Sequence, residues 1–161
     1  DVNKVINEEP SAEARQTYRD FYHKGLELTG AAHRAGVKVL VGTDYIVAGV
    51  TVHHEMEQLT LARLTPLEAL RAATILPAEY FGLQDEYGNV AQGMRADLIL
   101  LRKNPLEDIR NSLSIESVIF NGNLYDRMRL DNIERLVESR ANSWSIACKI
   151  VWEFIKNPVG Y

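Results

Sequence analysis

The stretch Ala35-Gly36-Val37-Lys38-Val39-Leu40-Val41-Gly42-Thr43-Asp44 decides the fold class. Four of the five residues in 37–41 are Val or Leu, a pattern typical of a strand buried in a parallel sheet. Before it, apolar residues recur at helical spacing behind a capping Ser11, and Gly36 suits the left-handed end of that helix. A helix that leads into a buried strand through one glycine is the αβ step of an α/β fold.

An acidic residue, Asp44, follows the end of this predicted strand. In parallel α/β folds, functional groups gather at the C-terminal ends of strands. Position alone also allows Asp44 to do no more than cap the next turn. His53 and His54 follow about ten residues later, but neighbouring helical residues point about 100° apart, so these two share one ion poorly. Spacing alone therefore predicts only an α/β piece joined to a small β unit.

Two helical regions are expected after Asp44. Residues 53–63 form the first, and Thr65-Pro66-Leu67-Glu68 begins the second with a capping box and a proline at its first position. A shorter helical piece over 78–81 ends at Gly82.

The pattern changes to short strands near residue 84. Strands are expected at 90–91 and 96–101, the second stopping before Asn104-Pro105. Residues 115–120 and 123–125 form a hairpin, because Asn121-Gly122 favours a type I′ turn.

The tail is predicted to be helical, and the whole chain divides into three parts. One helix begins at Asp131, with Glu134 in its cap, and a second apolar stripe covers 144–155. Few basic residues flank that stripe, so we expect it to dock on protein and not on a membrane surface. The expected domains are 1–83, 84–127 and 128–161.

Charge and cysteine content narrow the class of protein. A net charge of −4 with both signs interspersed argues against a nucleic-acid surface. The only cysteine, Cys148, cannot form an internal disulfide, and no apolar stretch is long enough to span a membrane. The first residues are polar and do not form a signal peptide, so we expect a cytoplasmic protein acting on small molecules.

Five segments in the correct order resemble the C-terminal part of the amidohydrolase superfamily, in its imidazolonepropionase-like and prolidase-like branch. They are Ala35–Asp44, His53–Leu59, Leu64–Thr74 (LTPLEALRAAT), Gly93–Ile109 with GMRADLILL and NPLEDI, and Val118–Arg127. The resemblance implies an α/β fold: the last helix–strand unit of a TIM-like (β/α)8 barrel with its following helices, part of a small β-sandwich, and a helical tail.

The resemblance also implies roles for three residues. Asp44 matches the aspartate of the eighth barrel strand, which in the family binds metal and handles the proton of the attacking water. His53 matches a histidine often found after that strand, expected to contact substrate or to brace the Asp44 loop. Tyr45 either lines the pocket or packs structurally. The implied cofactor is one or two divalent metal ions, expected to be zinc.

The sequence departs from the family pattern in its metal ligands. It has no His-x-His pair, and the lysine and histidines of the middle strands are absent. One carboxylate does not hold a catalytic zinc ion, which has three protein ligands in typical sites. Most ligands should therefore come from a missing N-terminal part or a companion chain, and the incomplete barrel should expose apolar surface. We also expect a homo-oligomer.

Three functional interpretations stay open at this stage. The resemblance favours hydrolysis of amide-type C–N bonds by a dipeptidase or N-acyl amino acid hydrolase. A cyclic amide hydrolase of the imidazolonepropionase type is the first alternative. The second is a non-catalytic assembly module, in which the β unit and apolar tail pair with another chain. Under all three interpretations, the 161 residues alone should be inactive.

Overall fold

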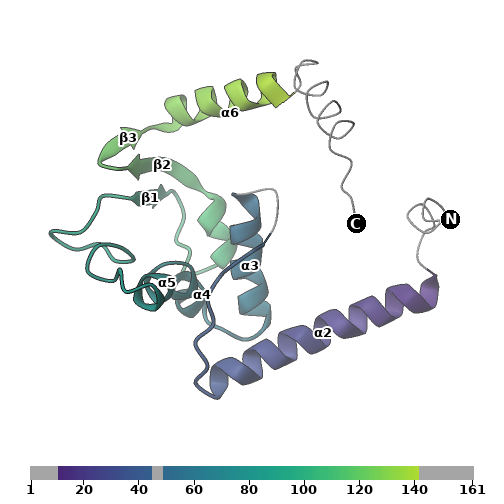
Figure 1. The fold of residues 1–161 in the computed structure, drawn as a ribbon. Coiled ribbons are helices and arrows are strands. Elements are labelled where there is room, and N and C mark those ends of the chain that lie inside the picture. Colours follow the sequence, from purple (N-terminus) through teal and green to yellow (C-terminus); the bar gives the residue numbers. More distant parts are fainter. Residues whose placement is uncertain (1–10, 45–48, 142–161) are drawn as a thin grey trace, which may run out of the picture. The chain divides into compact units, whose positions relative to one another are not determined.

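The computed structural model describes residues 11–44 and 49–141 (Figure 1). It is an α/β chain with a small antiparallel sheet. Contacts divide it into two compact units, Asp1–Arg95 with Leu101–Ser114 and Ala96–Leu100 with Ile115–Tyr161. The elements in chain order are α2 (Ala12–Arg34), α3 (Val50–Leu61), α4 (Pro66–Ala73), α5 (Ile75–Tyr80), β1 (Leu98–Leu101), the 3-10 helix η1 (Ile109–Leu113), β2 (Ile115–Phe120), β3 (Asn123–Tyr125) and α6 (Arg127–Ala141). The three expected domains, 1–83, 84–127 and 128–161, stay a prediction about the protein.

Helix α2 begins and ends where its sequence signals predict. The Ser11 hydroxyl oxygen accepts a hydrogen bond from the Ala14 backbone N–H at 3.1 Å. Just past the helix end, Gly36 has a φ of +88°, the left-handed conformation that glycine adopts without a Cβ penalty. Over the length of α2 the one buried residue is Gly30, while Tyr18 and Phe21 are 67% and 79% exposed. These two side chains thus expose apolar surface in the described residues.

The segment after α2 differs from the prediction. Residues 37–44 carry no strand assignment, although a strand was expected over 37–41. A strand is defined by its ladder, and no strand within residues 11–44 and 49–141 pairs with this segment. It is anchored to a helix instead, because the Val41 N–H donates to the Ala72 carbonyl at 2.9 Å.

The core of the first unit lies between α3, α4 and η1. Thr65 and Glu68 form the expected capping box at the start of α4, with Pro66 at the first helical position. α3 begins at Val50, three residues before the predicted start, and α5 begins at Ile75. The buried apolar residues of the cluster are Met56, Leu59, Ala62, Leu64, Ala69, Ala72 and Ile109.

The second unit contains the three-stranded sheet, in the order β1-β2-β3. β2 and β3 pair antiparallel with Phe120 opposite Asn123, so Asn121 and Gly122 alone form the turn. Their φ values of +49° and +77° are both positive, as a type I′ turn requires. The predicted hairpin is thus confirmed, whereas the short strand expected at 90–91 is not assigned.

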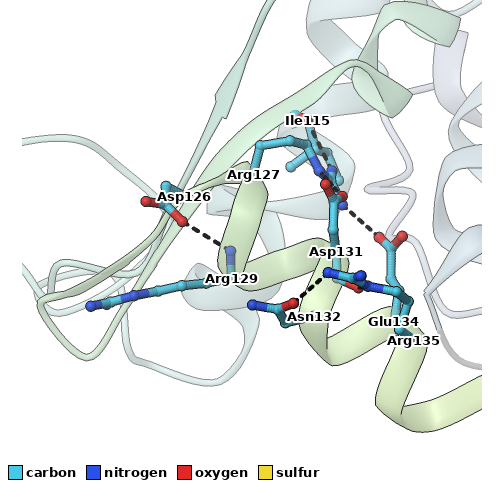
Figure 2. Close-up of polar contacts among 8 residues, drawn as sticks. All are labelled: Ile115, Asp126, Arg127, Arg129, Asp131, Asn132, Glu134 and Arg135. Carbon is cyan, nitrogen blue, oxygen red and sulfur yellow. Dashed lines mark hydrogen bonds and ion pairs between the residues drawn. The ribbon is translucent and has the colours of Figure 1, made fainter.

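Helix α6 starts at Arg127, four residues before the predicted position, and Figure 2 shows polar contacts around this start. Asp126 caps it, since its Oδ1 accepts from the Arg129 N–H at 2.9 Å. Asp131, expected at the cap, lies inside the helix and accepts from Arg127 Nε at 2.6 Å. The Arg127 guanidinium also donates to Glu134 at 2.8 Å and to the Ile115 carbonyl at 3.4 Å, which ties the helix start to the start of β2.

The remaining predictions for the tail fall on residues that the structure does not describe. The apolar stripe over 144–155 and Cys148 both lie outside the described residues. Among the helices of residues 11–44 and 49–141, none has the length and the apolar run that crossing a membrane requires.

Candidate functional site

Asp44 lies at the end of the segment that follows α2, and its side chain is exposed. Its φ of +43° is in the left-handed region, which aspartate tolerates better than most residues. Tyr45, the predicted pocket residue that follows, lies outside the described residues.

Two backbone hydrogen bonds hold the residues just before Asp44. Val41 is bound to the end of α4, as described above. The Gly42 N–H donates to Glu55 Oε1 of α3 at 3.0 Å. The other carboxylate oxygen, Glu55 Oε2, is buried and has no hydrogen-bond partner among the described residues. Helices α3 and α4 thus both anchor the approach to Asp44.

His53 lies in the first turn of α3 and is half-buried. Its Nδ1 is 2.9 Å from the hydroxyl oxygen of Ser112, a residue of η1 that is only 4% exposed. Burial lowers the pKa of His53 below its ordinary 6.5, and the neighbouring charge of His54 lowers it further. The ring is therefore mostly neutral at pH 7, with one nitrogen donating and the other accepting.

Helix α3 sends these side chains in different directions. His53 and Glu55 are two residues apart, which is about 200° around a helix. Accordingly His53 contacts η1, while Glu55 contacts the segment that leads to Asp44. The structure thus connects Asp44 to α3 through Gly42 and Glu55, and it shows no contact between His53 and Asp44 in the described part of the chain.

The donor set around Asp44 fits one position of a metal site and not a complete one. No group of three or more His, Cys, Asp or Glu side chains that could hold an ion occurs among the described residues. A carboxylate oxygen is a suitable ligand for a divalent cation, but catalytic zinc needs about three protein ligands.

Two hollows among the described residues of the first unit lie away from Asp44. One of about 500 Å³ is bounded by α2 and the end of α3, and its lining contains none of Asp44, His53 and Glu55. A second, of about 130 Å³, is lined by residues that include His33 and Glu68. Neither hollow can serve as a pocket for chemistry at Asp44.

The role of Glu55 is the feature that sequence reasoning missed. Nothing in the local pattern marks it, because its partner, Gly42, is 13 residues away and contributes a backbone N–H. The usable signal in the sequence is that the backbone N–H groups of the segment before Asp44 need acceptors from elsewhere in the chain.

Comparisons with known proteins agree on one family. Residues 19–125 match the model of the amidohydrolase family. Ochratoxinase from Aspergillus niger is 39% identical over 80 residues, which are 49% of this chain and 17% of that protein. Imidazolonepropionase from Deinococcus deserti is 38% identical over 88 residues, 52% of this chain and 22% of that protein.

A solved structure supports the same fold. A Xaa-Pro dipeptidase with bound methionine in its active site superposes with a TM-score of 0.58 and 29% identity. The match covers 63% of this chain and 25% of that one. The chain thus spans about a quarter or less of these three proteins, whose fold is of the TIM-barrel type. By the extent of the family match, the chain belongs to the amidohydrolase family.

Proposed function

We propose that this chain supplies the C-terminal part of a metal-dependent hydrolase that cleaves amide-type C–N bonds in small substrates. The observation that carries the proposal is Asp44, an exposed carboxylate at the end of an anchored segment, inside the stretch that matches the family. The remaining ligands and the rest of the barrel come from residues outside this chain, in the same polypeptide or in a companion chain.

Asp44 would hold one position on a divalent ion, zinc being the expected metal. The chemistry that such an ion supplies is activation of water and polarisation of the amide carbonyl. Asp44 accepts the proton of the attacking water and returns it to the leaving nitrogen. An exposed carboxylate on an anchored backbone suits this task, because it can approach the reacting atoms without moving the core of the unit.

His53 is the proposed substrate contact or brace of this site. Its Nδ1 is engaged by Ser112, so Nε2 is the ring nitrogen that remains for a polar group of the substrate. The neutral ring can donate or accept there without adding charge to the site. Tyr45, which directly follows Asp44, is the proposed pocket-lining residue.

Open-chain amides are the favoured substrates, with dipeptides and N-acyl amino acids as the classes to test. The similarity to a Xaa-Pro dipeptidase supports this choice. The similarity to imidazolonepropionase supports cyclic amides as the alternative.

The test is an assay of the complete enzyme, that is, residues 1–161 together with the rest of the barrel. Turnover of Xaa-Pro dipeptides and N-acyl amino acids, with cyclic amides left intact, is the expected result. Asp44→Asn should lower kcat about 10²–10⁴-fold, since it removes the proton acceptor. Rapid turnover of cyclic amides alone would favour the alternative, and full activity of Asp44→Asn would refute the role of Asp44.

A further inference from the structure

We propose that Glu55 is the positioning residue that fixes Asp44 for its work at the metal, an assignment that rests on the proposed function. Its side chain connects α3 to the backbone N–H of Gly42, which lies two residues before Asp44. The contact therefore acts on the backbone that carries the carboxylate and not on the substrate or the reacting atoms.

The argument begins with the backbone before Asp44. This segment lacks a strand ladder in the described residues, so few hydrogen bonds define its course. Val41 is bound to the Ala72 carbonyl and Gly42 to Glu55, at 2.9 and 3.0 Å. Of these two anchors, the second is the only one made by a side chain, and it is the nearer to Asp44.

The geometry at Asp44 makes this anchor important. With a φ of +43°, Asp44 has a backbone conformation that L-residues seldom adopt. Such a conformation persists only where the surroundings define it. A carboxylate acceptor on the N–H of Gly42 restrains the backbone two residues before Asp44, so the direction of the Asp44 side chain depends on Glu55.

The second oxygen of Glu55 distinguishes this role from simple packing. Glu55 Oε2 is buried without a partner among the described residues, and buried polar atoms without partners are rare enough to need a reason. Packing alone would favour an apolar side chain at this position of α3. A carboxylate kept here, with one oxygen on the backbone before Asp44, is better explained by the positioning that it provides.

Two other carboxylates offer matched comparisons. Glu79 of α5 also contacts this segment, through Lys38 Nζ at 3.0 Å, but the pair is largely exposed and holds a side chain rather than backbone. Glu57 is on the same helix as Glu55, two residues further along. Glu79→Ala and Glu57→Ala therefore remove a carboxylate close to the segment or helix without removing the Gly42 contact.

The first readout is backbone protection in the metal-free chain. Amide hydrogen exchange at Gly42 should be about tenfold faster in Glu55→Ala and unchanged in Glu79→Ala and Glu57→Ala. Glu55→Gln should exchange like the wild type, because its amide oxygen still accepts from the Gly42 N–H.

The second readout is zinc affinity and turnover of the complete enzyme. Glu55→Ala should weaken zinc binding and lower kcat by about 10–100-fold with KM little changed, as the loss of a group that orients a ligand does. Glu55→Gln should restore both to within about threefold of the wild type. If Glu55→Ala does not fold, Glu55→Asp replaces it, since the shorter side chain keeps the charge but does not reach Gly42.

Three outcomes would overturn the assignment. Zinc affinity and kcat that stay within twofold in Glu55→Ala would do so, as would a Glu55→Gln variant as impaired as Glu55→Ala. An equal loss in Glu79→Ala would also do so. The Asp44→Asn variant distinguishes failure of the positioning role from failure of the proposed function. If Asp44→Asn keeps its zinc and its activity, the proposed function fails. If Asp44→Asn loses them but the Glu55 variants keep wild-type zinc affinity and kcat, the positioning role alone fails.

Discussion

Replacing Gly30 by alanine should separate α2 from α3. A Cβ on Gly30 would lie 2.1 Å from the Ala62 carbonyl oxygen, whereas real Cβ atoms do not come closer than 3.0 Å, so the helices must part by about 0.9 Å. Overpacking of this kind costs about 1–3 kcal/mol. Alanine returns about 1 kcal/mol of helix propensity, so the free energy of unfolding of the first unit should fall by about 0–2 kcal/mol.

Gly25 provides the matched control on the same helix. A Cβ there meets no heavy atom within 4 Å, so Gly25→Ala should stabilise the chain by about 0.5–1 kcal/mol. Urea unfolding followed by circular dichroism measures both variants, and amide exchange over α2 shows whether the helix detaches from α3. Gly25→Ala should therefore raise the free energy of unfolding, whereas Gly30→Ala should lower it or leave it unchanged. Equal stabilisation by both would refute the close packing of α2 on the Ala62 carbonyl.

Three further predictions concern caps, pH and the hairpin. Thr65→Ala should cost about 1 kcal/mol in urea unfolding, because the hydroxyl acceptor of the capping box is lost, whereas Thr60→Ala, inside α3, should cost clearly less. Hydrogen bonds from the Thr65 backbone and hydroxyl, then from His33, lower the pKa of Glu68 from 4.5 to about 2. Because the pKa is lowered in the folded state, the unfolded chain binds the Glu68 proton first as pH falls. The stabilisation of the fold by ionised Glu68 is therefore present above pH 4.5 and is lost as pH falls towards 2. Glu68→Gln should remove this contribution to the pH dependence of urea unfolding. Gly122→Ala meets no heavy atom within 4 Å but keeps a φ of +77°, so it should destabilise the hairpin by about 1–2 kcal/mol, measured by amide exchange in β2 and β3, and an unchanged exchange rate would contradict the type I′ turn.

Features governed by neighbouring residues could be predicted from the sequence. The Ser11 cap, the capping box at Thr65 and the Asn121-Gly122 turn each depend on residues no more than four positions apart. Their local chemistry restricts φ and satisfies helix-end donors whatever the rest of the fold does. The structure reproduces all three.

Features governed by distant residues could not be predicted. A strand over 37–41 needs a neighbour to form its ladder, and the described residues contain none beside it. The observed start of α6 differs from the predicted one because Asp126 and Asp131 are both good N-cap residues. The contact of Arg127 with the start of β2 favours the earlier cap, Asp126. Tertiary contacts decided between local patterns that were equally good.

The same limit applies to the candidate site. Asp44 could be chosen as a candidate because the sequence predicted it at a strand end, where functional groups gather in parallel α/β folds, and the resemblance to a family implied its role. The contact of Glu55 with Gly42 could not, since the acceptor and the donor come from different elements and one of them is backbone. The resemblance implied that the metal ligands are incomplete, because the family's His-x-His pair does not occur in the sequence.

The most direct test of the central claim is the zinc content and native mass of the assembly that contains this chain, compared between the wild type and Asp44→Asn. Native mass spectrometry and metal analysis on the same preparation give both values. The account predicts one or two zinc ions in a wild-type assembly that holds more polypeptide than these 18.2 kDa, and less zinc in Asp44→Asn. A lone 18.2 kDa species that hydrolyses amides, or equal zinc in both proteins, would contradict it.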